Sequence, residues 1–428
     1  MTLTLSTLHA MEILDSRGKP TIAVQATLSD GESAWAQVPS GASTGRHEAR
    51  ELRDSDPARY HGAGVQRAVA NVQRILGPGL AGMLAGDHPA LDARMIELDG
   101  SSDKSRLGAN AILGVSCAVA RAVSQSRKLP LWKYLHETFP GNRAPSIPSP
   151  MVNILSGGLH AGQNIEFQDF LVTANGIGNY ADALQAIVAV HRAARQVLAD
   201  RSIPVTGVAD EGGWGPLLPS NEAALQILTE AIERAGFQPR EQMSIAIDAA
   251  ATHFYSDGSY RLESESRTLS SGSLIGLLEE WSGKYPIYSI EDGLAEDDWA
   301  GWQALTRRLG DRLQLVGDDL FTTNPARVRR GIQDRAGNAV LVKMNQIGTL
   351  TETFEVLEIA REAGMRAVVS ARSGETEDSF LADLATASGA GQIKVGSVTR
   401  SERLAKYNRL LQIGQESGLQ FAPVISTH

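Results

Sequence analysis

The second half of the sequence repeats one unit, a short apolar segment that ends in a charged residue. Six such segments read SIAIDAA, YPIYSIED, LQLVGDD, AVLVKMN, RAVVSAR and QIKVGS, and helical stretches lie between most of them. The charged residues at their ends are Asp248, Glu291, Asp318, Lys343, Arg372 and Lys394. They follow one another at intervals of 22 to 43 residues, about the length that a strand, a helix and two loops require. Alternating units predict a parallel sheet, and this many in series favour a closed β/α barrel.

The first part of the chain has a different pattern. Three strand-like segments, TLTLSTLHAMEIL, TIAVQATLS and SAWAQVP, alternate with the turn sequences DSRGKP and SDGES and predict a β-meander over residues 1 to about 55. Helical stretches follow near Gly64 to Leu76 and Leu107 to Ser126. The segment HETFPGNRAPSIPSP is rich in Pro, Gly and Ser and predicts a domain boundary. The expected fold is therefore α/β, with an α+β domain over residues 1–135 and a β/α barrel over residues 140–428.

Composition excludes several classes of protein. With 21% charged and 42% hydrophobic residues the chain resembles an ordinary globular protein. A formal charge of −9 and the lack of a basic run argue against nucleic-acid binding. The single cysteine, Cys117, excludes an internal disulfide. The N-terminus does not have the pattern of a signal peptide, and the most apolar stretch is too short to span a bilayer. We therefore expect a cytoplasmic protein that does not interact with membranes.

The acidic strand ends predict a metal site. In a β/α barrel the C-terminal ends of the strands meet at one mouth, where active sites lie. Asp248, Glu291 and Asp318 would place three carboxylates there, and unpaired they would repel one another. A hard divalent cation resolves this repulsion, and oxygen ligands suit Mg²⁺. Asp292 and Asp319 follow two of these acids directly, and we expect them to support the ligands.

The basic strand ends predict an anionic substrate. Lys343 would lie in a partly dry mouth, where a lysine loses proton affinity and can act as a base; the alternative is a salt bridge to one of the acids. Arg372 and Ser373 offer a guanidinium fork and a hydroxyl to a phosphate-type oxyanion, and Lys394 offers a charge to a second anion such as a carboxylate. These groups suit removal of a proton α to a carboxylate that is bound to the metal.

Three loops carry further polar groups. VADEGGWGP contains Asp210 and Glu211, and SGGLHAGQNIEFQDF contains His160, Gln168 and Asp169. A carboxylate opposite the base can act as a general acid on a leaving hydroxyl, although each residue alone is equally consistent with an ordinary polar loop. The Gly/Ser-rich segment VPSGASTGRHEA predicts a lid over the mouth, and its alternative is a flexible surface loop.

A series of longer motifs resembles the enolase family. They run in order from residue 12 to about residue 408: EILDSRGKPT, VPSGASTG, LGANAILGVS, DEGG, SIEDGLAEDDW, QLVGDDLFTTN, KMNQIGTLTET, RSGETED and RSERLAKYN. The resemblance implies the interconversion of 2-phosphoglycerate and phosphoenolpyruvate, usually by a homodimer or a higher homo-oligomer. Members of this superfamily use a Lys or His base and one or two Mg²⁺ ions.

The resemblance also implies roles for individual residues. The first Mg²⁺ would be held by Asp248, Glu291 and Asp318, and a second, which binds with the substrate, by Ser43 of the lid. Lys343 would remove the C2 proton, while Glu211 would help hydroxide to leave C3, in a network that includes Asp169. The remaining substrate contacts would be His160, Gln168, Arg372, Ser373 and Lys394.

The sequence departs from the family pattern at five positions. Ala371 stands where SHRSGETED has a histidine, and Asp169 stands where QEF has a glutamate. Ser156 and Lys19 each replace an asparagine, and His253 replaces a glutamate. Loss of an imidazole beside the phosphate site removes a hydrogen-bonding group and opens space. One strong contact contributes about 1–3 kcal/mol, which is roughly tenfold or more in rate.

These departures favour an enolase-type lyase whose substrate carries a modified phosphorus group. The product would be of the carboxyphosphonoenolpyruvate type, as in phosphonate antibiotic biosynthesis, and Arg46 and Lys19 are candidate partners for the added carboxylate. One alternative is an ordinary glycolytic enolase that acts on 2-phospho-D-glycerate. An alternative of another class is an inactive paralogue that serves as a binding protein, against which the retained Asp248, Glu291, Asp318 and Lys343 argue.

Overall fold

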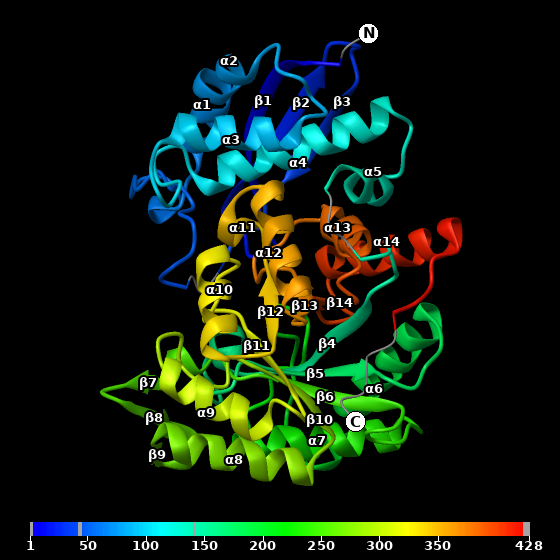
Figure 1. The fold of residues 1–428 in the computed structure, drawn as a ribbon. Coiled ribbons are helices and arrows are strands. Elements are labelled where there is room, and N and C mark those ends of the chain that lie inside the picture. Colours follow the sequence, from blue (N-terminus) through cyan, green and yellow to red (C-terminus); the bar gives the residue numbers. More distant parts are fainter. Residues whose placement is uncertain (1–2, 42–44, 140–142, 423–428) are drawn as a thin grey trace.

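The computed structural model describes residues 3–41, 45–139 and 143–422. The N-terminal strands and helices form one part of the molecule, and the barrel with its surrounding helices forms the other (Figure 1). Within the described residues, no helix is both long and apolar enough to cross a membrane.

The N-terminal part is built on a three-stranded antiparallel sheet. Its strands β1 (Leu5–Leu14), β2 (Pro20–Leu28) and β3 (Ser33–Gln37) pair in sequence order, which confirms the predicted meander. Helix α4 (Ala109–Ser126) packs on β2 and β3, and nearly all of its residues are buried. Gly114 permits this close approach, because a Cβ there would lie 2.5 Å from Cγ2 of Val24.

Other helices complete this part of the chain. The predicted helix near residues 64–76 is found as α1 (Gln66–Asn71), which continues into the helical turn Val72–Leu76. Three helices were not predicted, namely α2 (Gly77–Leu80), α3 (His88–Asp99) and α5 (Leu131–Thr138).

The C-terminal part is a closed barrel, as predicted. Its strand order is β10-β11-β12-β13-β14-β4-β5-β6. All six predicted strands are present: β6 (Met243–Asp248), β10 (Ile287–Glu291), β11 (Gln314–Gly317), β12 (Ala339–Val342), β13 (Arg366–Ser370) and β14 (Gln392–Gly396). The expectation of a wholly parallel sheet is wrong at one strand, because β5 (Asp169–Ala174) runs antiparallel to both β4 (Ser149–Ser156) and β6.

The direction of β5 follows from its connection. Between β4 and β5 the chain forms a loop with a single 3₁₀ turn, Gly158–Ala161, and no α-helix. A return to the same end of the sheet needs a crossover, which usually contains a helix. Without one, β5 enters the barrel from the mouth, and its first residue, Asp169, lies at the mouth beside Asp248.

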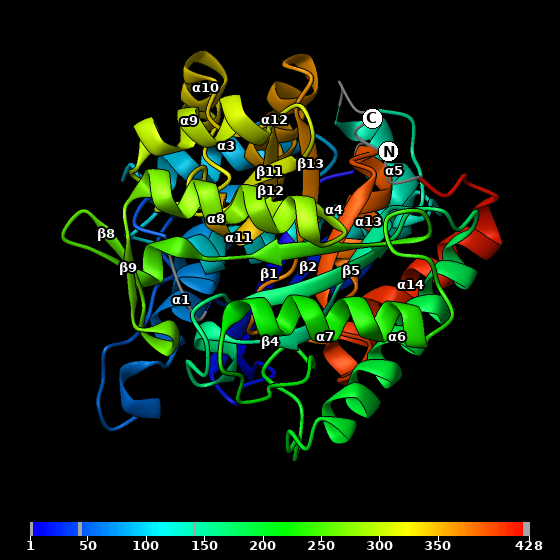
Figure 2. The ribbon, with the colours of Figure 1, turned by 90° about the horizontal axis from the view of Figure 1, so that it is seen from below.

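Helices surround the barrel (Figures 1 and 2). They are α6 (Tyr180–Asp200), α7 (Asn221–Arg234), α8 (Ser271–Lys284), α9 (Trp299–Leu309), α10 (Pro325–Asp334), α11 (Met344–Ile347), α12 (Leu350–Glu362), α13 (Phe380–Ser388) and α14 (Ser401–Ser417). Many begin at a polar side chain that accepts a backbone N–H bond of the first turn: Asn179, Ser220, Ser270, Asp298, Asn324 and Thr349. A small antiparallel sheet, β7 (Tyr255–Ser256), β8 (Ser259–Leu262) and β9 (Arg267–Leu269), projects between β6 and α8.

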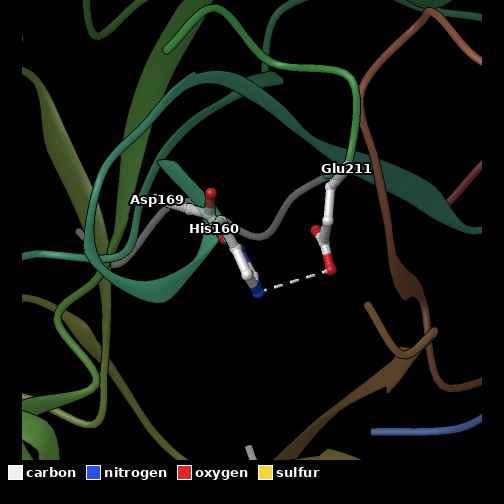
Figure 3. A group of neighbouring side chains, drawn as sticks. All are labelled: His160, Asp169 and Glu211. Carbon is white, nitrogen blue, oxygen red and sulfur yellow. Dashed lines mark hydrogen bonds and ion pairs between the residues drawn. The ribbon is translucent and has the colours of Figure 1, made fainter. Parts of the chain in front are cut away.

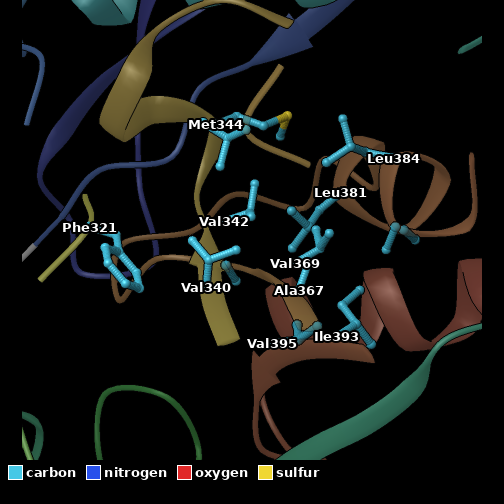
Figure 4. Close-up of a cluster of buried hydrophobic side chains, with 14 of the residues drawn as sticks. Phe321, Val340, Val342, Met344, Ala367, Val369, Leu381, Leu384, Ile393 and Val395 are labelled. Carbon is cyan, nitrogen blue, oxygen red and sulfur yellow. The ribbon is translucent and has the colours of Figure 1, made fainter. Parts of the chain in front are cut away.

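Apolar side chains fill both sides of the barrel wall. The interior is packed by Met151, Leu171, Ala246, Val316, Ala339, Leu341 and Val368. On the outer side, residues of β12, β13 and β14 pack against Leu381 and Leu384 of α13 (Figure 4). This packing makes the barrel a rigid support for the side chains at its mouth.

The N-terminal part meets the barrel next to the predicted anion site. Ser40, in the first part of the predicted lid, exchanges two backbone hydrogen bonds with Gly374, of 2.7 and 2.9 Å. The Ser40 hydroxyl donates to Asp15 at 2.7 Å. The turn DSRGKP therefore lies against the segment RSG.

Candidate active site at the barrel mouth

The C-terminal ends of the strands surround a cavity. Asp248 and Glu291 end β6 and β10, Asp318 follows β11, and Lys343 follows β12. The cavity is lined by His160, Gln168, Glu211, Asp248, Lys343, Ser370, Ala371, Arg372, Ser373, Lys394 and Val395. Its volume, including the opening to solvent, is about 370 Å³. Most candidate residues from distant parts of the sequence thus face one space, while Ser43 lies outside the described residues.

Two lysines pair with the three predicted metal ligands. Lys394 Nζ lies 2.7 Å from both Asp248 Oδ2 and Glu291 Oε2, and Lys343 Nζ donates to Asp318 Oδ2. Burial alone would raise the pKa of Asp248 and of Asp318, but their lysine partners outweigh it and lower both. Burial and the charge of Asp248 hold the pKa of Glu291 well above its usual range.

The acidic groups fit a hard cation. Oε1 of Glu291 is buried and has no hydrogen-bond partner within the described part of the chain. Among the described acids, Asp292, Asp318 and Asp319 have ligand atoms within 4.8 Å of one another, whereas the predicted set of Asp248, Glu291 and Asp318 does not form such a group. Asp292 accepts the backbone N–H bonds of Asp318 at 2.9 Å and of Asp319 at 2.8 Å, so it orients this turn. The donors are all oxygens, which suits Mg²⁺.

The pKa of Lys343 differs from the prediction. Burial lowers the pKa of this lysine, but the Asp318 carboxylate outweighs burial and the pKa is raised. The predicted lowering of the Lys343 pKa is therefore wrong in this structure. The alternative, a salt bridge to one of the acids, is present, and the partner is Asp318. A cation on Asp318 would compete with the lysine for this carboxylate and lower its proton affinity.

Arg372 pairs with a carboxylate of the predicted lid segment, Glu48. Its Nη1 lies 2.9 Å from Glu48 Oε2 and donates to Asn345 Oδ1 at 2.9 Å. Both members of the Arg372–Glu48 pair are buried. Arg403 donates to the backbone oxygens of Arg372, at 2.7 Å, and Ser373, at 2.6 Å, and so fixes this turn.

Ala371 lies inside the same cavity. Its backbone N–H donates to the carbonyl of Lys394 at 2.8 Å, and the residue lines the cavity together with Arg372 and Ser373. It is also buried among the hydrophobic core residues. An alanine takes up less volume than the histidine of the family pattern beside the groups predicted to bind phosphorus oxygens.

His160 links two carboxylates on the opposite side (Figure 3). Its Nδ1 lies 2.8 Å from Asp169 Oδ2, and its Nε2 lies 3.9 Å from Glu211 Oε1. Burial alone would lower the pKa of His160, but the charges of Asp169 and Glu211 raise it to about 9. Burial alone would raise the pKa of Glu211, but the charges of His160 and of nearby basic residues together lower it. These shifts favour a protonated His160 imidazolium beside a deprotonated Glu211 carboxylate.

The two candidate partners for an added carboxylate do not reach the cavity. The Arg46 side chain is 74% exposed and lies 3.4 Å from Asp297. Lys19 is exposed in the turn after Gly18. Neither residue is among the described residues that line the cavity, and the role of each as a substrate contact stays a prediction. His253 is also exposed, which agrees with a surface change.

Several contributors were missed by the sequence analysis. Glu48 and Asn345 contact Arg372, and Gln346 donates to Asp318 Oδ1 at 2.9 Å. Asn153 donates to Asp169. The only signal was proximity in sequence, since Glu48 belongs to the lid segment and Asn345 and Gln346 follow Lys343 within three positions. Buried amides of this kind have no distinctive pattern in a single sequence.

Comparison with protein families covers nearly the whole chain. The family described as enolase, N-terminal domain, matches residues 5–135. The family described as enolase, C-terminal TIM barrel domain, matches residues 144–422. Together with the closed barrel and the convergent groups at its mouth, these matches show that the chain belongs to the enolase family.

Proposed function

We propose that this enolase-family lyase removes a C2 proton and eliminates water from a 2-phosphoglycerate-like substrate whose phosphorus carries an added carboxylate. The product would be an enolpyruvate ester of the carboxyphosphonoenolpyruvate type. The observation that carries the proposal is the position of Ala371, which lines the cavity next to Arg372 and Ser373. A larger group on phosphorus needs space there, and an alanine provides it.

Each proposed role rests on the side chain that faces the cavity. Lys343 would take the C2 proton once its pair with Asp318 is broken. The substrate carboxylate would lie near Lys394, and the phosphorus oxygens would bind the Arg372 guanidinium and Ser373 hydroxyl. Glu211, with His160 and Gln168, would face the hydroxyl that leaves from C3. The electron pair of the C2–H bond forms the C2=C3 bond, the C3–O bond breaks, and the hydroxyl leaves as hydroxide, whose departure Glu211 would assist.

Asp248, Glu291 and Asp318 would hold the first of two Mg²⁺ ions, and Ser43 would contribute to a second that binds with the substrate. When bound, these ions stabilise the negative charge that develops on the substrate carboxylate. Lys394 pairs with Asp248 and Glu291, so its proposed role includes holding these two carboxylates in position. The assembly is proposed to be a homodimer or a higher homo-oligomer.

Ordinary glycolytic enolase activity is the second candidate. It is favoured by the convergence of Lys343, Lys394, Arg372 and Glu211 on one cavity, since these groups suffice for a plain phosphate ester. Under this reading Ala371 and Asp169 are tolerated changes.

Turnover of two substrates separates the candidates. Purified protein with Mg²⁺ is assayed for enol formation from 2-phosphoglycerate and from the analogue in which phosphorus carries a carboxylate in place of one oxygen. We expect the analogue to have the higher kcat/KM. A higher kcat/KM for 2-phosphoglycerate establishes the glycolytic candidate, and turnover of neither substrate contradicts both.

A further inference from the structure

The first turn of α12 is completed by side chains of the N-terminal part of the chain. The backbone N–H of Leu350 donates to Ser116 Oγ of α4 at 3.1 Å, and that of Thr351 donates to Asp92 Oδ2 of α3 at 3.0 Å. The Thr351 hydroxyl donates to the same Asp92 oxygen at 2.6 Å. The first N–H groups of a helix have no acceptor within the helix. The N-terminal part therefore supplies acceptors that fix where α12 begins.

Lys104, in the loop between α3 and α4, contacts the same turn through both its aliphatic chain and its charge. Its Nζ lies 2.9 Å from Glu352 Oε1, and Glu352 Oε2 accepts from the Thr349 hydroxyl at 2.6 Å. Its chain packs on Gly348, because a Cβ at that position would lie 2.9 Å from Lys104 Cδ. Lys104 is 5% exposed and has a φ of 58°, a left-handed conformation that is unfavourable for a lysine. The fold therefore maintains a strained residue at this contact.

The segment that this contact fixes begins at the proposed base. The turn before α12 starts only five positions after Lys343, and the short helix α11 lies between them. On α11, Asn345 accepts from Arg372 at 2.9 Å, and Gln346 donates to Asp318 at 2.9 Å. Figure 1 shows α11 and α12 where the N-terminal part meets the barrel. The segment is therefore attached to β12 at one end and to the N-terminal part at the other.

We propose that Lys104 is a positioning residue for the removal of the C2 proton. Its ion pair with Glu352 fixes the segment that follows Lys343, and so keeps the Lys343 amine where it can reach the C2–H bond. A displacement of roughly 1 Å of a reacting group can cost about 100-fold in rate, so a base that borders a loosely attached segment would react slowly. This inference rests on the proposed role of Lys343 as the base, but not on the identity of the phosphorus group.

Two variants remove the ion pair from opposite sides. Lys104→Met keeps most of the aliphatic chain and removes the ammonium group, while Glu352→Gln removes the carboxylate charge. Because both break one contact, the double variant should lower kcat no further than the more damaging single variant. Arg409→Met is the matched control, because Arg409 also pairs with a buried carboxylate, Asp383, at 2.7 Å. That pair joins α14 to α13, which do not carry the segment after Lys343.

Hydrogen–deuterium exchange of the full-length protein tests the attachment without turnover. In Lys104→Met we expect the amides of residues 350–352 to exchange about tenfold faster than in the native protein, because the start of α12 opens locally. Arg409→Met should leave this exchange at the native rate. Unchanged exchange in Lys104→Met overturns the inference whatever the turnover.

An isotope effect at C2 tests the consequence for catalysis. With Mg²⁺ present, kcat is measured for 2-phosphoglycerate and for the P-carboxylated analogue, each carrying hydrogen or deuterium at C2. In Lys104→Met and Glu352→Gln we expect kcat to fall about 10- to 100-fold with KM within about twofold. Both variants should show a full primary isotope effect, because proton removal then limits the rate. Arg409→Met should keep the native kcat and the native isotope effect.

The outcomes separate this inference from the proposed function. An unchanged kcat in Lys104→Met, or a lower kcat without a primary isotope effect, overturns the inference. Faster exchange at the start of α12 in a protein that turns over neither substrate supports the attachment and contradicts the proposed function instead.

Discussion

Nη1 of Arg372 lies 2.9 Å from Oε2 of Glu48, and both side chains are almost fully buried. The guanidinium proposed to bind phosphorus oxygens thus already pairs with a carboxylate of the predicted lid segment. Glu48 also accepts the backbone N–H of Gly45 at 2.8 Å. One side chain therefore connects the anion site to the segment that carries the lid.

The first prediction concerns this pair. Glu48→Gln should lower the free energy of unfolding by about 3 kcal/mol, because it removes one partner of a buried ion pair. Inorganic phosphate should raise the melting temperature more in Glu48→Gln than in the native protein, since the added anion replaces the lost carboxylate. Differential scanning calorimetry with and without phosphate measures both effects.

Glu97→Gln is the matched control for this experiment. Glu97 is 70% exposed and pairs with Arg94 on a helix surface, so its loss should change stability by no more than about 0.5 kcal/mol. If phosphate raised the melting temperature equally in the native protein and in Glu48→Gln, Glu48 would not compete with phosphate for Arg372.

A second prediction concerns Mg²⁺. If the three carboxylates hold the ion, Mg²⁺ at 100 times its Kd should stabilise the native protein by about 2.7 kcal/mol. Glu291→Gln should lose most of this stabilisation, because it removes the charge of a ligand whose Oε1 has no other partner among the described residues. Calorimetry over a Mg²⁺ titration, with Asp257→Asn as the control, measures the effect. Unchanged Mg²⁺ stabilisation in Glu291→Gln would place the ion elsewhere.

A third prediction follows from the raised pKa of His160, about 9 against 6.5 for an ordinary histidine. Because the folded-state pKa is the higher one, the charged His160 stabilises the fold fully below about pH 6.5. This contribution is lost as the pH rises through about 9. The stability difference between native protein and His160→Gln should therefore be largest near pH 6 and smallest near pH 10. Urea denaturation at several pH values measures it, and a difference that grows with pH would contradict the assigned protonation.

Much of the barrel was predictable because its determinants are local. Each of the six predicted strands is a short apolar run bounded by polar residues, and the charged ends of several of these strands fall at the mouth. Strand β5 was missed, since FLVTA is preceded by a polar loop and not by a helix, and its antiparallel direction depends on that missing crossover.

The site was predictable only in part. Residues such as Asp248 and Lys343 stand at strand ends, where topology brings them together. One partner of Arg372 comes from a distant segment, since Glu48 is more than 320 positions from Arg372. The position of Arg46 in the lid motif does not reveal that its side chain pairs with Asp297 in this structure. The raised pKa of Lys343 depends on a contact with Asp318 that only the folded chain defines.

The most direct test of the central claim is the ratio of kcat/KM for the P-carboxylated substrate to that for 2-phosphoglycerate, in native protein and in Ala371→His. We predict that this ratio is above one in the native protein and falls about tenfold or more in Ala371→His. The imidazole would fill the space beside Arg372 and add a contact to a plain phosphate. A native preference for 2-phosphoglycerate, or a ratio that Ala371→His leaves unchanged, would contradict the claim that this position adapts the site to a larger phosphorus group.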